Sequence, residues 1–135
     1  MGVGPEMMVL TCFEKSAWAA VSMLAVIIAG GVGVALHASQ PEERLRHIIV
    51  QTGARLVLAG VQTAELAQRL APDVVVVKPT SFEGLNTTLP ENPVLSQEQA
   101  PSADNALFVV FTSGSTGTPK GAVLTHSGFS SATRY

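Results

Sequence analysis

Short apolar runs alternate with amphipathic stretches along most of this chain. Four runs are bounded by glycine, proline or polar residues and predict buried strands: residues 32–36, 56–59, 74–77 and 106–111. Three stretches predict helices: residues 16–29, 42–52 and 63–70. Because buried strands separated by helices are typical of a parallel sheet covered on both faces, the pattern predicts an α/β layered fold.

The second helix has the clearest local signals. Ser39 can accept a hydrogen bond from the backbone of Glu42, and the Glu42 carboxylate can reach back, which is the spacing of a capping box. Leu45 and Ile48 then recur on one helical face, and Gly53 is the kind of residue that ends a helix. We therefore expect a capped helix that packs one face inward and stops at Gly53.

The longest apolar stretch, residues 18–36, matches the roughly 20 residues that a membrane helix needs. Three glycines between residues 30 and 33 disfavour a continuous span, since each costs about 1 kcal/mol in a helix interior. A helix, a tight turn at Gly30 and Gly31, and a strand over 32–36 explain the same residues. A single-pass membrane protein stays an alternative, whereas acidic residues before the apolar run disfavour a signal peptide.

Charge and cysteine content exclude several function classes. The formal net charge is -2, and the few basic residues are scattered, so we expect neither a nucleic acid partner nor an anionic membrane surface. Cys12 is the single cysteine, and no Cys/His cluster has metal-ligand spacing, so we expect a cytoplasmic protein without structural zinc. Cys12 lies in an apolar run and is interpreted as a buried small side chain, not a nucleophile.

The periodicity disappears over residues 78–105, where prolines fall among Ser, Thr, Asn and Glu. This composition predicts an irregular surface connection. Residues 106–126 are then predicted as a strand, a loop and a second strand over 122–125, before a helix begins near Ser127.

The loop is the candidate binding site, and it consists of Thr112, Ser113, Gly114, Ser115, Thr116, Gly117, Thr118, Pro119, Lys120 and Gly121. Glycine permits the positive φ angles that turn successive backbone N–H groups toward an anion. The hydroxyls add neutral donors, and Lys120 adds a charge that suits phosphate oxygens. Three or four such bonds, each worth about 1.5 to 3 kcal/mol, would hold a triphosphate at micromolar to millimolar affinity. A flexible connection without a ligand is the alternative interpretation.

The order of residues in the loop is more specific than its composition. It is not a Walker A loop, because Pro119 precedes Lys120 and Gly121 follows it. The string 112–121, continuing to His126, resembles the phosphate-binding signature of the adenylate-forming, or AMP-binding, superfamily. Further segments resemble the adenylation domains of fungal nonribosomal peptide synthetases: Cys12-Phe13-Glu14-Lys15-Ser16, Ala29-Gly30-Gly31 and Pro41-Glu42-Glu43-Arg44-Leu45.

This resemblance covers residues 1–135 and implies a partial adenylation domain, belonging to the family's large N-terminal subdomain. It implies that the loop closes over the β and γ phosphates of ATP, with Mg²⁺, while an amino or other carboxylic acid becomes an acyl-adenylate in secondary-metabolite biosynthesis. ATP and a larger synthetase or carrier domain are the implied partners.

The resemblance assigns no catalytic residue here, because the family's substrate pocket and catalytic lysine lie beyond the matched motifs, and Lys120 is not that lysine. We therefore expect the chain alone to be inactive, with a nucleotide-binding or split-subunit module as an alternative. An incompletely covered sheet also predicts poor solubility or self-association.

The chain departs from the family pattern near the second predicted strand. The usual Val-Pro-Leu-Asp-Pro is Val34-Ala35-Leu36-His37-Ala38 here, and the usual Leu-Lys-Ala is Ile27-Ile28-Ala29. These changes remove turn-setting residues and a charge. We interpret His37 as a loop residue and not a ligand, and His126 as a residue that orders the exit of the loop.

Overall fold

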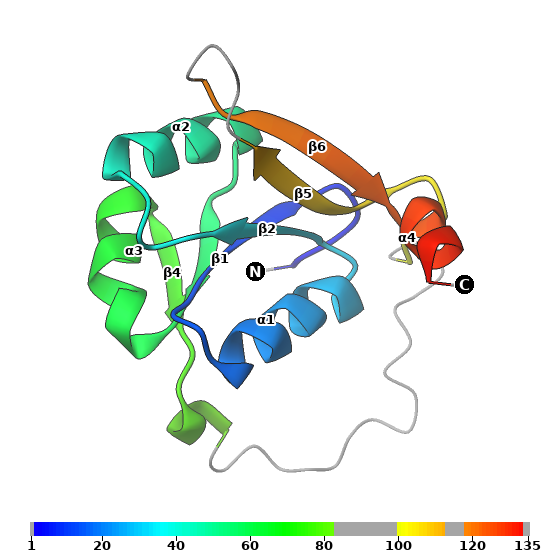
Figure 1. The fold of residues 1–135 in the computed structure, drawn as a ribbon. Helices are drawn as coiled ribbons and strands as arrows, with labels where there is room; N and C mark the ends of the chain where they lie inside the picture. Colours follow the sequence, from blue (N-terminus) through cyan, green and yellow to red (C-terminus); the bar gives the residue numbers. More distant parts are fainter. Residues whose placement is uncertain (1, 83–99, 113–117, 134–135) are drawn as a thin grey trace.

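The computed structural model describes residues 2–82, 100–112 and 118–133 (Figure 1). Its elements follow one another in this order: β1 (Met8–Cys12), α1 (Ala17–Ile28), β2 (Val32–Leu36), α2 (Glu42–Thr52), β3 (Leu56–Ala59), the 3-10 helix η1 (Val61–Thr63), α3 (Ala64–Leu70), β4 (Asp73–Val76), the 3-10 helix η2 (Pro79–Phe82), β5 (Ala106–Thr112), β6 (Lys120–Thr125) and α4 (His126–Ala132).

The described strands form one six-stranded sheet in the order β4-β3-β1-β2-β5-β6. All neighbouring pairs are parallel except β5 and β6, which are antiparallel. The predicted α/β fold is therefore confirmed, and the strand expected over 122–125 is present as β6, although the sequence did not indicate its antiparallel direction. Residues 8–12, which are not among the predicted strands, form β1 inside the sheet between β3 and β2.

Helices cover the sheet on two faces (Figure 1). On one face α2 and α3 pack against the strands, and Leu10, Leu45 and Ile48 are almost completely buried in the larger core cluster. On the other face α1 contributes Val26 to a smaller cluster with Val9 and Leu56. The two faces are thus filled to different extents.

The long apolar stretch divides as predicted into α1, a glycine turn and β2. α1 ends at Ile28, Gly30 takes the left-handed conformation with φ at 82°, and β2 begins at Val32. At 1.5 Å per residue, a 12-residue helix is about 18 Å long, whereas the hydrocarbon core of a membrane is about 30 Å thick. Among the described helices none is long and apolar enough to cross a membrane, so the membrane alternative is not favoured.

The capping box predicted for α2 is wrong. The helix begins at Glu42 with Pro41 in the cap position, and no side chain caps it. The Glu42 carboxylate instead accepts from Arg46 at 2.6 Å and lies 3.5 Å from Arg69 of α3. The Glu42 carboxylate therefore interacts with two guanidinium groups and not with the backbone N–H groups that a capping box would require. The predicted end is confirmed, because Gly53 has φ at 64° and donates its N–H to Ile49 O.

Candidate functional site

The predicted loop joins two strands whose ends are paired. Thr112 and Lys120 are opposite each other in the antiparallel ladder, and Thr112 Oγ1 donates a long hydrogen bond of 3.5 Å to Lys120 O. This pairing brings the two ends of the loop together. Five of the ten predicted residues lie outside the described part of the chain and stay predictions: Ser113, Gly114, Ser115, Thr116 and Gly117.

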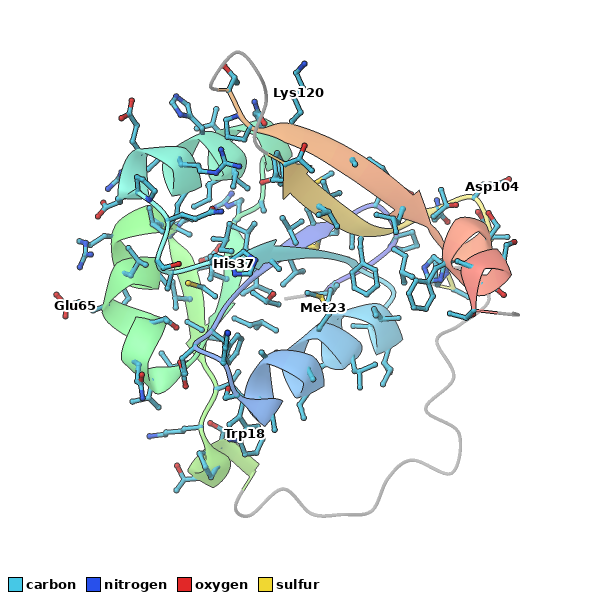
Figure 2. All side chains as sticks on the ribbon, viewed as in Figure 1. Trp18, Met23, His37, Glu65, Asp104 and Lys120 are labelled. Atoms are coloured by element: carbon cyan, nitrogen blue, oxygen red, sulfur yellow. The ribbon has the colours of Figure 1, made fainter. Side chains whose placement is uncertain are left out.

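The described part of the loop presents donors at an edge of the sheet where ligands commonly bind. It starts at the carboxyl end of β5, and open parallel sheets bind their ligands beyond the carboxyl ends of the strands. Thr112, Thr118 and Lys120 are all exposed, and Figure 2 shows the Lys120 side chain projecting outward beside the loop. Lys120 makes no ion pair with any residue that the structure describes. Its charge is therefore available to an anion.

Gly121 allows close packing at the start of β6. A Cβ at this position would lie 3.1 Å from Val109 Cγ1 and 3.2 Å from the Phe111 ring. Those distances are shorter than comfortable carbon–carbon contacts of about 3.5 to 4.0 Å. The absence of a side chain at Gly121 therefore lets β5 and β6 pack closely next to the loop.

Pro119, at the exit of the loop, shares a cavity with residues of α2. It is buried, and it lines a cavity of about 280 Å³ together with four residues at the start of that helix: Pro41, Glu43, Arg44 and His47. Within the described ranges Arg44 makes no side-chain hydrogen bond or ion pair. Sequence reasoning missed this basic neighbour, because about 70 positions separate α2 from the loop and no local pattern links them.

The donors at the loop base suit phosphate. Two threonine hydroxyls and an ammonium group donate to phosphate oxygens, whereas Mg²⁺ prefers oxygen ligands from carboxylates and from the phosphates themselves. Among residues 2–82, 100–112 and 118–133, no three His, Cys, Asp or Glu side chains are grouped so that they could hold a metal ion.

Cys12 is buried, as its apolar neighbours predicted. Burial raises the pKa of the thiol, and a hydrogen bond with Thr63 only partly opposes this rise. Its carbonyl oxygen accepts from the Thr63 hydroxyl and from the Gly60 N–H, which tie β1 to the segment after β3. A buried thiol that holds its proton is a poor nucleophile.

The two candidate histidines lie in different places. His37 is exposed and follows β2 directly, so its predicted place in a loop is confirmed, whereas the expectation that it binds no ligand stays a prediction. His126 lies at the far end of β6, because Thr125 pairs with Ala106 while Lys120 pairs with Thr112. Its assignment to the exit of the phosphate loop is therefore wrong. Its backbone N–H bonds to Asn105 O, and its Nε2 is buried without a partner among the described residues.

Comparisons with known proteins agree over the whole chain. The family described as AMP-binding enzyme matches residues 1–135. The nonribosomal peptide synthetase imqB of Aspergillus flavus is 49% identical over 135 residues, which are 99% of this chain and 4% of that protein. D-lysergyl-peptide-synthetase subunit 2 of Claviceps purpurea is 45% identical over 98% of this chain and 10% of its own length. The chain thus spans a small part of these relatives.

Solved structures show the same fold. The nonribosomal peptide synthetase FmoA3, in a form bound to alpha-methyl-L-serine-AMP, has a TM-score of 0.76 at 25% identity and covers 98% of this chain, which corresponds to 14% of that chain. MatB from Rhodopseudomonas palustris has a TM-score of 0.70 at 23% identity, over 98% of this chain and 26% of its own. The latter likeness concerns the fold alone.

Proposed function

Since the chain belongs to the AMP-binding enzyme family, we propose that it carries the triphosphate-holding part of an acid-adenylating site, of the kind found in fungal nonribosomal peptide synthetases. ATP with Mg²⁺ is the proposed ligand, and an amino or other carboxylic acid is the proposed co-substrate. A larger synthetase or its carrier domain is the proposed partner.

One observation carries this proposal. Thr112, Thr118 and Lys120 are exposed at the carboxyl edge of the sheet, and their loop ends are held together by the pairing of β5 with β6. The Thr118 hydroxyl would donate to phosphate oxygens, as would the Thr112 hydroxyl on giving up its long bond to Lys120 O, and Lys120 would balance part of their charge. When bound, ATP supplies the phosphorus that the carboxylate attacks. The chain's own contribution is to hold and orient the phosphates.

Isothermal titration with ATP and Mg²⁺ tests the proposal, with Lys120→Ala as the main variant. Loss of one charge-assisted contact, worth about 1.5 to 3 kcal/mol, should weaken binding about tenfold or more. Lys78→Ala is the matched control, because Lys78 is also exposed but follows β4 at the opposite edge of the sheet. It should bind ATP like the parent chain.

Two further measurements sharpen this experiment. Gly117→Val should also weaken binding, because valine resists the positive φ angles of an anion-holding loop. Equal affinities for Lys120→Ala and Lys78→Ala would contradict the proposed site. Pyrophosphate exchange driven by a carboxylic acid should be absent for the chain alone, and its detection would contradict our expectation that the chain binds without turnover.

A further inference from the structure

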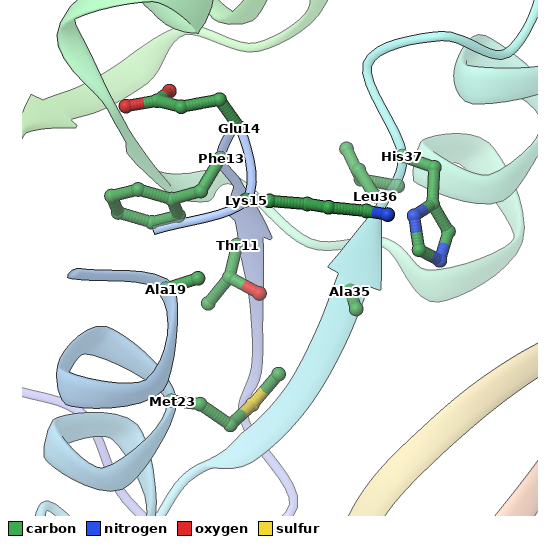
Figure 3. A pocket seen from close by; sticks show the side chains of 9 residues that line it. All are labelled: Thr11, Phe13, Glu14, Lys15, Ala19, Met23, Ala35, Leu36 and His37. Carbon is green, nitrogen blue, oxygen red and sulfur yellow. The ribbon is translucent and has the colours of Figure 1, made fainter. Parts of the chain in front are cut away.

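A second cavity lies away from the loop, between α1 and the carboxyl ends of β1 and β2 (Figure 3). It has a volume of about 220 Å³. Its wall is mostly apolar and includes Phe13, Ala19, Met23 and Ala35, with Thr11 as a polar member. For comparison, an apolar cavity of about 150 Å³ in another protein holds benzene. The cavity is therefore large enough for one small ring or a branched alkyl group.

Two basic side chains meet at the mouth of this cavity. Lys15 extends across the end of β2 in the direction of His37, and both side chains line the cavity (Figure 3). Both residues are exposed, and neither side chain makes an ion pair with any residue that the structure describes. The one carboxylate in the wall belongs to Glu14, and it packs against Gly60, where an added Cβ would lie 2.5 Å from Glu14 Oε2. Two basic side chains thus line the cavity, while the Glu14 carboxylate lies against Gly60 and its Oε2 is buried without a hydrogen-bond partner among the described residues.

A small side chain and a basic side chain from the end of β2 line this same cavity. Ala35 and His37 are both in its wall. The small Ala35 side chain leaves space there. The His37 imidazole supplies an N–H donor in addition to the Lys15 ammonium group. Space and basic donors therefore occur together, which favours an anionic ligand.

We propose that this cavity binds a small organic acid, with its carboxylate held by Lys15 and His37 and its apolar body among Ala19, Met23 and Ala35. An apolar pocket with a few convergent polar groups is the usual form of a small-molecule site. Hydrogen bonds from charged donors to a carboxylate are among the strong ones in proteins. The site is separate from the phosphate loop and does not depend on ATP.

Benzoate is the probe, and benzyl alcohol is its neutral counterpart of similar shape. Titration followed by calorimetry or by amide chemical shifts should show saturable benzoate binding, and benzyl alcohol should bind at least about tenfold more weakly. His37→Asp and Lys15→Met should each weaken benzoate binding about tenfold, because each removes a donor and the first adds repulsion. Gln51→Asp, which adds the same charge on α2, and Lys78→Met are the matched controls and should have no effect.

Ala35→Leu provides a test that leaves the charges unchanged. Leucine should fill the apolar half of the cavity and weaken the binding of both benzoate and benzyl alcohol. This variant still tests the proposal if circular dichroism shows that His37→Asp alters the fold. Equal affinity for benzoate and benzyl alcohol, or unchanged benzoate binding in Lys15→Met and Ala35→Leu, would overturn the proposal. Displacement of benzoate by inorganic tripolyphosphate would also overturn the proposal, because it would show that Lys15 and His37 bind phosphate. Lys120→Ala should leave benzoate binding intact, so failure of the loop would be distinguished from failure of this site.

Discussion

The two faces of the sheet differ in how completely they are covered. On the α2 and α3 face, Leu10, Leu45 and Ile48 are at most 1% exposed. On the α1 face, Leu24 is 57% exposed and Val110 is 50% exposed. Figure 1 shows two helices against the first face and α1 against the second. The first face is closely packed against its helices, whereas the second leaves apolar side chains exposed to solvent.

The proposed binding groups gather on the less covered face. Side chains alternate along a strand, so Thr112 shares the face of Val110 and of Phe108, which lines a cavity with Leu24 of α1. The cavity beneath Lys15 and His37 opens on this face as well. The comparison indicates that one face mainly stabilises the fold, whereas the other carries the groups proposed to bind ligands.

The largest expected effect is on stability, and it should distinguish the faces. Leu45→Ala removes a completely buried side chain and should lower the free energy of unfolding by about 2 to 5 kcal/mol. Leu24→Ala removes a side chain that is mostly in water, and it should cost no more than about 0.5 kcal/mol. Urea denaturation of both variants measures the difference. Similar losses would show that the α1 face is as closely packed as the other.

The next effect concerns self-association through the α1 face. Leu24 and Phe129 are 57% and 44% exposed and line one cavity of about 400 Å³ with Phe108. The double variant Leu24→Ser with Phe129→Ser should weaken self-association about tenfold, since it removes apolar surface worth about 1 to 2 kcal/mol in a contact. Analytical ultracentrifugation reads the change. Val50→Ser is the control, because Val50 is 79% exposed on α2. A larger effect from the control would place the association elsewhere.

The smallest effect is a pH dependence on the well-covered face. The hydrogen bond from Arg46, and the nearby charge of Arg69, lower the pKa of Glu42 below its ordinary value. A lowered folded-state pKa stabilises the protein above the unfolded-state pKa, and this stabilisation is lost as the pH falls through the folded-state pKa. Glu42→Gln should therefore be less stable than the parent at about pH 7, and the difference should shrink as the pH is lowered toward about 3. Thermal melts of both proteins at both pH values measure this difference. A stability difference that does not change with pH would exclude a contribution from the titration of Glu42.

Patterns within short segments predicted most of the elements. The runs at 32–36 and 56–59 became β2 and β3 with the same bounds, and Gly53 ended α2, because continuous apolar runs and left-handed glycines act locally. The capping box failed where a distant group intervened, since Arg69 of α3 helps to hold the Glu42 carboxylate. β1 was overlooked although its apolar run meets the same criterion as the other strands.

The class of fold, the family and the proposed phosphate loop could all be inferred before the structure was known, because they depend on the order of neighbouring residues. The three-dimensional structure was needed to show that β6 runs antiparallel, that His126 lies at the far end of β6 from Lys120, and that Pro119 shares a cavity with residues of α2. It also brought Lys15 and His37 together at one cavity. The physical reason is that these contacts join segments of different strands and helices, and their energies depend on how the sheet aligns those segments in space.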